Sequence, residues 1–227
     1  VVNDESLHFD YLLVASGCEN RISDRAENVL NLQDFAASAG SELLMPLLES
    51  NHQSEQSISV VGGGATGIQF LFEIKQFRSR QKSKATLRLI PSGEQVLEQF
   101  PRGFDTYVQS RMQELNIAFY PNTYYRGQQS NTILLAEKHT QKHIELSSGL
   151  TILFLGKSQR TSYTANAFGQ ILIDQTPLPN IFVAGDCSVY RSVGSNTLTA
   201  HSAVRKGKLV AHNILRHSGL PGLLEPY

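Results

Sequence analysis

The sequence predicts an α/β fold built on a mostly parallel sheet. Apolar, strand-like runs alternate with amphipathic helical segments through the middle of the chain, in the order β-α-β-α-β. Residues 123–148 then form alternating patches broken by polar turns, which predict a β-meander. The chain is 41% hydrophobic and 18% charged, as globular proteins are, and its 227 residues suffice for one large domain or two small ones.

The first predicted element is a buried strand over residues 8–16, which ends at a glycine. A helix follows within residues 32–50. Asp34 is its expected N-cap, and a break is expected near Gly40 or Pro46.

The central β-α-β-α-β unit comes next. Its predicted elements are a strand over 58–61, a helix over 66–79, a strand over 85–90, a helix over 103–116 and a strand over 117–122. Apolar side chains repeat at helical spacing, so one face of each helix should be buried. The expected inward residues are Ile68, Leu71, Phe72 and Phe77 in the first helix and Phe104, Val108, Met112 and Leu115 in the second.

The last predicted elements follow the meander. They are strands over 150–156, 168–175 and 180–186 and a closing helix over 197–215.

Composition argues against several classes of function. Lys and Arg together number 20, as do Asp and Glu, so the net charge is zero and nucleic-acid binding through phosphate neutralisation is disfavoured. No apolar run approaches the roughly 18 residues of a membrane span. Cys18 and Cys187 form no CxxC and favour a cytoplasmic setting with free, structural thiols. His139 and His143 lie in a polar segment, and no metal site is predicted.

A glycine-rich loop joins the strand and the helix of "SISVVGGGATGIQF", residues 57–70. Gly62, Gly64 and Gly67 match G-x-G-x-x-G, a spacing that permits a tight turn, close approach of a pyrophosphate and close packing of helix on strand. The N–H groups at the start of the helix would face the anion. The residues predicted to bind a dinucleotide here are Gly62, Gly63, Gly64, Ala65, Thr66 and Gly67. The alternative is a glycine-rich turn retained only for packing.

The acidic residue that usually binds the ribose 2′-hydroxyl is absent from its expected place. The strand that should carry it ends at Pro91. Glu94 lies three residues beyond the strand, and Arg88 lies within it. Discrimination between NADH and NADPH is therefore expected to be modest, below about 2 kcal/mol, unless Glu94 or Arg88 reads the ribose.

Four segments resemble the pyridine nucleotide-disulfide oxidoreductase superfamily, and within it the type II NADH dehydrogenases. They are "FDYLLVASG" at 9–17, "VVGGGATGIQF" at 60–70, "LTILFLG" at 150–156 and "NIFVAGDCS" at 180–188. Their order and spacing match the family across almost the whole chain. The resemblance implies an FAD-dependent oxidoreductase that takes hydride from NADH or NADPH, with no catalytic side chain required.

The resemblance also implies a domain arrangement. A Rossmann-like NAD(P)-binding domain with a β-meander, residues 31–155, is inserted into a partial FAD-binding domain made of residues 1–30 and 156–227. The family's first FAD-pyrophosphate loop would lie upstream of Val1, so we expect the chain to be a piece of a longer protein. The flanking segments 1–17 and 168–227 should pair with each other as a partial sheet and expose apolar surface that invites a homodimer, and the 227 residues should hold no FAD tightly.

The resemblance carries over to individual residues. It places Gln69 and Gly156 near the nicotinamide and Gly185, Asp186, Thr199, Ala200 and His201 at the flavin. Other readings stay open: Asp186 as a helix cap, His201 as a solvent-facing residue, the helix start as purely structural, and Gly156 as a packing residue.

Departures from the family limit what is carried over. The absence of CxxC and CxxxxC disfavours disulfide reduction. Many relatives have Glu at position 69, and the A-Q-x-x-x-Q of the type II enzymes is replaced by "AHSAVRKG", which puts His201 and Arg205 at the two glutamines. The electron acceptor is therefore unassigned, with a quinone in doubt. Peripheral membrane association of the intact protein stays open, as does a second function, a non-catalytic dinucleotide-binding module with a regulatory or assembly role.

Overall fold

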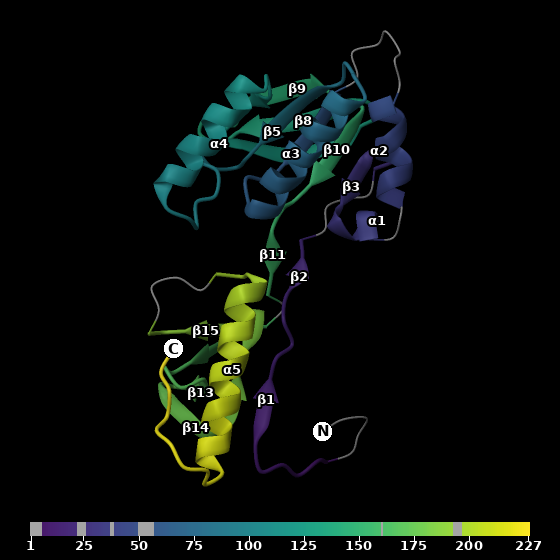
Figure 1. The fold of residues 1–227 in the computed structure, drawn as a ribbon. Coiled ribbons are helices and arrows are strands. Elements are labelled where there is room, and N and C mark those ends of the chain that lie inside the picture. The colour runs from purple at the N-terminus through teal and green to yellow at the C-terminus, as the bar shows by residue number, and fades with distance from the viewer. Residues whose placement is uncertain (1–5, 22–25, 37–38, 50–56, 160, 193–196) are drawn as a thin grey trace. The chain divides into compact units, whose positions relative to one another are not determined.

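The computed structural model describes residues 6–21, 26–36, 39–49, 57–159, 161–192 and 197–227 (Figure 1). They form two compact units. The central unit is Arg21–Gly156, and the flanking unit combines Val1–Asn20 with Lys157–Tyr227. The central unit is thus inserted in sequence between the two segments of the flanking unit. The first segment of the flanking unit ends at residue 20, whereas the sequence led us to expect residue 30. The difference arises because the strand Val29–Asn31 pairs within the central sheet.

The central unit is built on a five-stranded sheet in which every pair of neighbours is parallel. In spatial order its strands are β3 (Val29–Asn31), β10 (Leu150–Leu153), β4 (Ser57–Val61), β5 (Thr86–Ile90) and β6 (Ala118–Phe119). The helices α3 (Ala65–Arg80) and α4 (Arg102–Glu114) connect β4 to β5 and β5 to β6. The predicted α/β class and its parallel sheet are confirmed.

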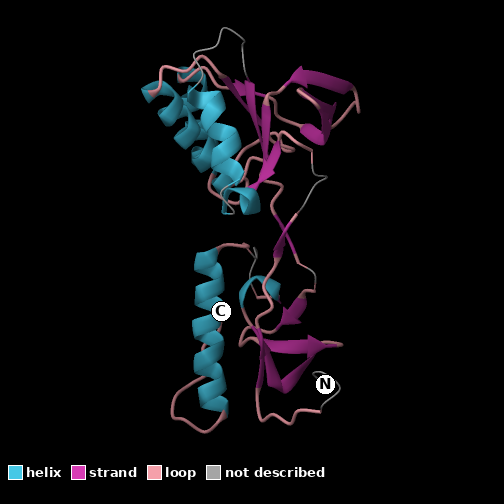
Figure 2. Ribbon diagram, turned by 90° about the vertical axis from the view of Figure 1, so that its right-hand side faces the viewer, coloured by secondary structure: helices cyan, strands magenta, loops and turns pink. Residues whose placement is uncertain are grey.

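In the central unit the helices cover one face of the parallel sheet and the meander lies on the other (Figure 2). Strand alternation divides the core between these two faces. Ile58 and Val60 of β4 pack in a cluster with residues of the helices, such as Leu71. The next residue, Val61, packs instead with Ile133 from the predicted meander. That meander is an antiparallel sheet of β7 (Thr123–Gln129), β8 (Thr132–Glu137) and β9 (His143–Ser147), as expected.

Helix α4 corrects one prediction about the core. Val108 and Met112 are buried as expected, but Phe104 is 52% exposed. Its neighbour Asp105 is buried instead, and its Oδ1 accepts hydrogen bonds from the Val96 N–H at 2.8 Å and from Gln109 at 2.9 Å. Asp105 therefore faces inward, because its carboxylate accepts the Val96 N–H. The apolar periodicity had placed Phe104 there.

The helix expected within 32–50 is two helices, α1 (Leu32–Ala36) and α2 (Ala39–Glu49), and residues 37–38 lie outside the described part. Asp34 as N-cap was wrong. The Asn31 side chain accepts from the Gln33 N–H at 2.8 Å, while Asp34 reaches back to the Asn31 N–H at 2.7 Å, the reciprocal pattern of a capping box. A break was expected near Gly40 or Pro46, and the interval between α1 and α2, residues 37–38, lies close to Gly40 but outside the described part. Helix α2 continues through both, with an exposed proline.

The flanking unit contains a five-stranded mixed sheet and one long helix. In spatial order its strands are β1 (Leu12–Val14), β14 (Thr176–Val183), β13 (Gln170–Ile173), β12 (Tyr163–Ala165) and β15 (Ser188–Tyr190). The helix is α5 (Ala200–His217), and β2 (Glu19–Asn20) pairs with β11 (Lys157–Ser158) in a short ribbon.

Strand β1 differs from the buried strand expected over 8–16. It is three residues long, and Leu12 and Leu13 are 38% and 42% exposed. The reason is its place at the edge of the sheet, where it pairs in parallel with β14. The two flanking segments of the sequence therefore pair with each other, as expected.

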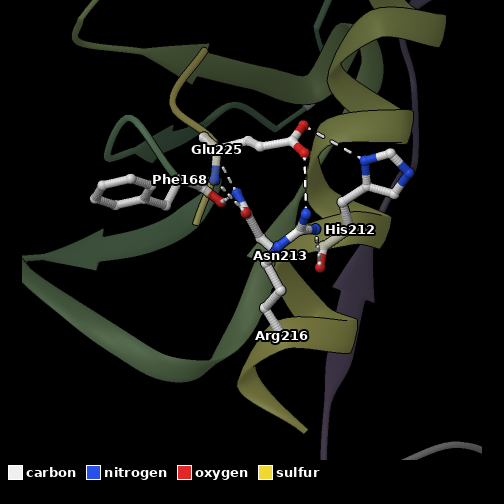
Figure 3. Close-up of polar contacts among 5 residues, drawn as sticks. All are labelled: Phe168, His212, Asn213, Arg216 and Glu225. Carbon is white, nitrogen blue, oxygen red and sulfur yellow. Dashed lines mark hydrogen bonds and ion pairs between the residues drawn. The ribbon is translucent and has the colours of Figure 1, made fainter. Parts of the chain in front are cut away.

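The residues after α5 fold back along that helix (Figure 1). Figure 3 shows the polar contacts that hold them there. Asn213, fully buried on α5, donates to the carbonyl groups of Phe168 (3.0 Å) and Glu225 (2.9 Å) and accepts from the Glu225 N–H (2.8 Å). The Glu225 carboxylate contacts Arg216 at 3.2 Å and His212 at 3.4 Å. One buried amide thus joins α5, the β12–β13 turn and the C-terminal segment.

Candidate functional site

The glycine loop of the central unit is tightly packed at its first and third glycines. Gly62 has φ +114°, and a Cβ there would lie 2.2 Å from the carbonyl oxygen of Phe154. A Cβ on Gly67 would lie 2.6 Å from the Gly62 carbonyl oxygen. These two positions require glycine for the turn and for the packing of α3 against the loop.

The second glycine is different. Gly64 is the N-cap of α3, has φ −78°, and has open space within 4 Å of an added Cβ. Gly64, Ala65 and Thr66 are exposed, and no side chain caps the first turn of this 16-residue helix. The free N–H groups and the positive end of the helix dipole are therefore open to an anion.

A cavity of about 180 Å³ lies beside this loop. Gly63 and Gly64 form one wall, and the segment after β5 forms the other. The residues from that segment are Pro91, Ser92, Gly93, Gln95, Leu97, Glu98 and Gln99. Whole small-molecule sites typically measure about 300–1,000 Å³, so this cavity is the size of one part of a dinucleotide.

Two residues considered for the ribose lie elsewhere. Glu94 is exposed and does not line the cavity. Arg88 donates from Nη1 to the Ser147 carbonyl at 2.9 Å. The acid that does line the cavity is Glu98, which sequence reasoning missed because it lies seven residues beyond Pro91, outside the usual spacing.

The predicted nicotinamide residues do not line this cavity either. Gln69 is exposed on α3. Gly156 has φ +80°, and its carbonyl accepts the Arg21 N–H at 3.0 Å. A left-handed turn that favours glycine is a structural reason for that residue.

Asp186 of the flanking unit lies in the short 3₁₀ helix η1 (Gly185–Cys187), after Gly185 at φ +72°. Its Oδ2 accepts from the Cys18 thiol at 3.0 Å and from Lys157 Nζ at 3.0 Å. Burial raises the pKa of the Asp186 carboxyl, but the bonds from Cys18 and Lys157 outweigh this and hold the pKa below its ordinary value. Sequence reasoning missed Lys157, and it treated Cys18 as structural without assigning it a partner.

The Cys18 thiol should react slowly with alkylating reagents. Burial first, and then the bond to the Asp186 carboxylate, raise the pKa of this thiol, and only the thiolate reacts. At pH 8, below the raised pKa, we expect Asp186→Asn to speed iodoacetamide labelling of Cys18 roughly three- to tenfold, as read by mass spectrometry. Cys187, fully buried, is the internal control. Equal rates in both proteins would contradict the assignment of this bond.

The start of α5 lies in the same unit as Asp186. Thr199 is its N-cap, and its Oγ1 accepts from the Ser202 N–H at 3.2 Å, while Ala200 and His201 are exposed. On the buried face of α5, Lys206 donates to the Ser188 carbonyl at 2.9 Å. Burial lowers the pKa of Lys206, a buried cation that sequence reasoning missed.

The described residues contain neither a cluster that could hold a metal ion nor a helix that could cross a membrane. No three His, Cys, Asp or Glu side chains gather there in a way that could hold a metal ion. None of the helices described there has both the length and the apolar character needed to cross a membrane.

Residues 1–207 match the family described as pyridine nucleotide-disulphide oxidoreductase. Among curated proteins, the chain is 22% identical over 179 residues to the external alternative NAD(P)H-ubiquinone oxidoreductase B1, mitochondrial, of Solanum tuberosum, covering 70% of this chain and 31% of that protein. It is 23% identical over 205 residues to ferroptosis suppressor protein 1 of Taeniopygia guttata, covering 81% and 51%.

Among solved structures, NDH2 of Plasmodium falciparum in complex with NADH superimposes with a TM-score of 0.65 at 19% identity, covering 82% of this chain and 45% of that one. The chain thus spans from about a third to about half of these relatives. The family expected from the sequence is confirmed by a match over residues 1–207: the chain belongs to the pyridine nucleotide-disulphide oxidoreductase family.

Proposed function

We propose that the intact protein is a flavin-dependent oxidoreductase that accepts hydride from NADH or NADPH, and that the central unit binds the nicotinamide nucleotide. The observation that carries this is the loop at the start of α3. Gly62 and Gly67 are closed by packing, while Gly64 opens onto a cavity. A loop that served packing alone would need glycine only where a Cβ clashes, and no clash arises at Gly64.

Within the central unit, the chain's own groups bind and orient. The exposed N–H groups of the first turn, at Ala65 and Thr66, would hold the pyrophosphate. The cavity beside Gly63 would take the adenosine side of the nucleotide. Gln69 and Gly156, which lie outside the cavity lining, remain our candidates for the nicotinamide side.

We assign FAD to the flanking unit. Its candidate contacts are Gly185, Asp186 and the start of α5 at Thr199, Ala200 and His201. Both donors to Asp186 approach the same oxygen, Oδ2, and a carboxylate can accept further hydrogen bonds, so this group fits a ligand rich in hydroxyls. The chemistry that a bound FAD supplies is acceptance of hydride and release of electrons.

The electron acceptor is the open part of this proposal. A ubiquinone appears in the name of the potato relative, whereas His201 and Arg205 stand in place of the two family glutamines here. A quinone and an artificial acceptor should therefore be compared. We also propose a cytoplasmic location, because the described cysteines are free thiols.

A second candidate is a non-catalytic module that binds a nucleotide for regulation or assembly. The observation that favours it is the engagement of Asp186 by Cys18 and Lys157 inside the flanking unit. In this candidate the carboxylate stabilises the fold and contacts no flavin.

Two measurements test these proposals. NADH titrated into the 227-residue chain should bind, as followed by calorimetry, and absence of heat at millimolar NADH would overturn nucleotide binding. The intact protein, incubated with FAD, should turn yellow and oxidise NADH when ferricyanide or a quinone is supplied. Nucleotide binding without colour or oxidation would favour the non-catalytic module.

A further inference from the structure

We propose that Glu98 reads the adenosine ribose and gives the central unit a preference for NADH over NADPH. This inference rests on the nucleotide binding proposed above and names the residue responsible for its selectivity. Of the described residues that line the cavity beside Gly63 and Gly64, Glu98 carries the only charge. Pro91, where a ribose acid is normally expected, lines the same cavity without a polar side chain.

The loop that carries Glu98 is fastened at its start. The Pro91 carbonyl accepts the Thr123 N–H at 3.1 Å. The Gly93 carbonyl accepts the Asn122 N–H at 2.9 Å. The donors are the first residue of β7 and the residue before it, so this half of the loop is held to the start of β7.

The same loop is fastened again just before Glu98. The Val96 N–H donates to the buried Asp105 carboxylate at 2.8 Å, and the Leu97 N–H donates to the Gly63 carbonyl at 2.8 Å. Leu97 has φ +54°, a conformation that non-glycine residues rarely adopt. Such backbone persists only where the surroundings impose it, and it occurs often at ligand-binding loops. The residue before Glu98 is therefore hydrogen-bonded to the glycine loop, which fixes the backbone next to Glu98.

The side chain of Glu98 lies within the same loop, on the cavity side. The Glu98 carboxylate lies beside Gly93, where a Cβ would come within 1.9 Å of Glu98 Oε1. In a dinucleotide, the adenosine ribose is joined to the pyrophosphate by a single carbon. A pyrophosphate at the start of α3 would thus put this sugar in the adjoining cavity, beside Glu98.

The chemistry of this arrangement favours a free ribose. A carboxylate accepts hydrogen bonds from the sugar hydroxyls and repels a phosphate on the 2′-oxygen. Arg88, the nearby cation considered from the sequence, donates instead to the Ser147 carbonyl. We therefore infer that Glu98 favours NADH by hydrogen bonding to the ribose hydroxyls and disfavours NADPH by repelling its 2′-phosphate.

The test uses ADP-ribose and 2′-phospho-ADP-ribose, titrated by calorimetry into the 227-residue chain. These probes keep the pyrophosphate and both riboses but lack the nicotinamide, so no hydride can be transferred and the result does not depend on flavin. The unsubstituted chain should bind ADP-ribose at least about tenfold more tightly, and Glu98→Gln should reduce this ratio to about twofold or less. Gly93→Ala places a Cβ where the Glu98 carboxylate lies and should also reduce the ratio of the two affinities. Glu94→Gln is the matched control and should leave it unchanged.

The outcomes separate the two proposals. Equal affinity for both probes in the unsubstituted chain, or an unchanged ratio in Glu98→Gln, would overturn the role of Glu98 and leave nucleotide binding standing. Failure of the unsubstituted chain to bind either probe would overturn nucleotide binding itself. Because Glu98 is exposed, its conversion to glutamine should not disturb the fold, which circular dichroism can check.

Discussion

Gly64→Val is expected to weaken ADP-ribose binding by at least about a hundredfold, or roughly 2.7 kcal/mol, while leaving the fold intact. Gly64 has an ordinary φ of −78°, and an added Cβ has no atom within 4 Å, so a side chain can begin there without a clash at its Cβ. The same open space is where the pyrophosphate must approach the backbone. Calorimetry measures the affinity, and hydrogen–deuterium exchange of the central unit measures the fold.

Gly62→Val is the matched control because it should fail for the opposite reason. With φ +114° and the Phe154 carbonyl 2.2 Å from the new Cβ, it should destabilise the central unit by about 3 kcal/mol or more, visible as faster exchange of β4 and β10. Unchanged affinity in Gly64→Val would show that the glycine loop is not the nucleotide site.

The second large effect is expected in the flanking unit. Asn213→Ala removes three hydrogen bonds at once and leaves the Phe168 carbonyl and both main-chain groups of Glu225 without their side-chain partner. Since losing a partner for a buried polar group costs about 1–3 kcal/mol, we expect a loss of about 2–4 kcal/mol in the free energy of unfolding of this unit. Exchange should rise in α5 and in the segment that follows it.

His212→Ala is the control for that result. His212 contacts the same Glu225, but its side chain is 54% exposed, and an exposed ion pair contributes about 0–1 kcal/mol. Peptides from the central unit provide an internal reference in both variants. If Asn213→Ala and His212→Ala raised exchange equally, the buried amide would not be what holds the C-terminal segment.

How much could be predicted from the sequence depended on whether the signal was local. Runs such as Ser57–Val61 and Thr86–Ile90 could be recognised as strands because aliphatic and β-branched residues dominate them. The glycine loop between Val61 and α3 could be recognised because turn, close approach and helix packing each demand glycine at a fixed spacing. The meander was equally readable, since alternation with period two is a property of the chain itself.

What the sequence by itself determined, then, is the parallel sheet, the meander, the glycine loop and the family. The tertiary structure alone decided which polar groups meet. Asp105 rather than Phe104 faces inward because the Val96 N–H needs an acceptor. Asp186 meets Cys18, 168 residues away in sequence, and Glu98 reaches the cavity only through the turn at Leu97. Apolar burial follows a short period along the chain, whereas a hydrogen bond depends on the positions of two atoms that long-range folding brings together.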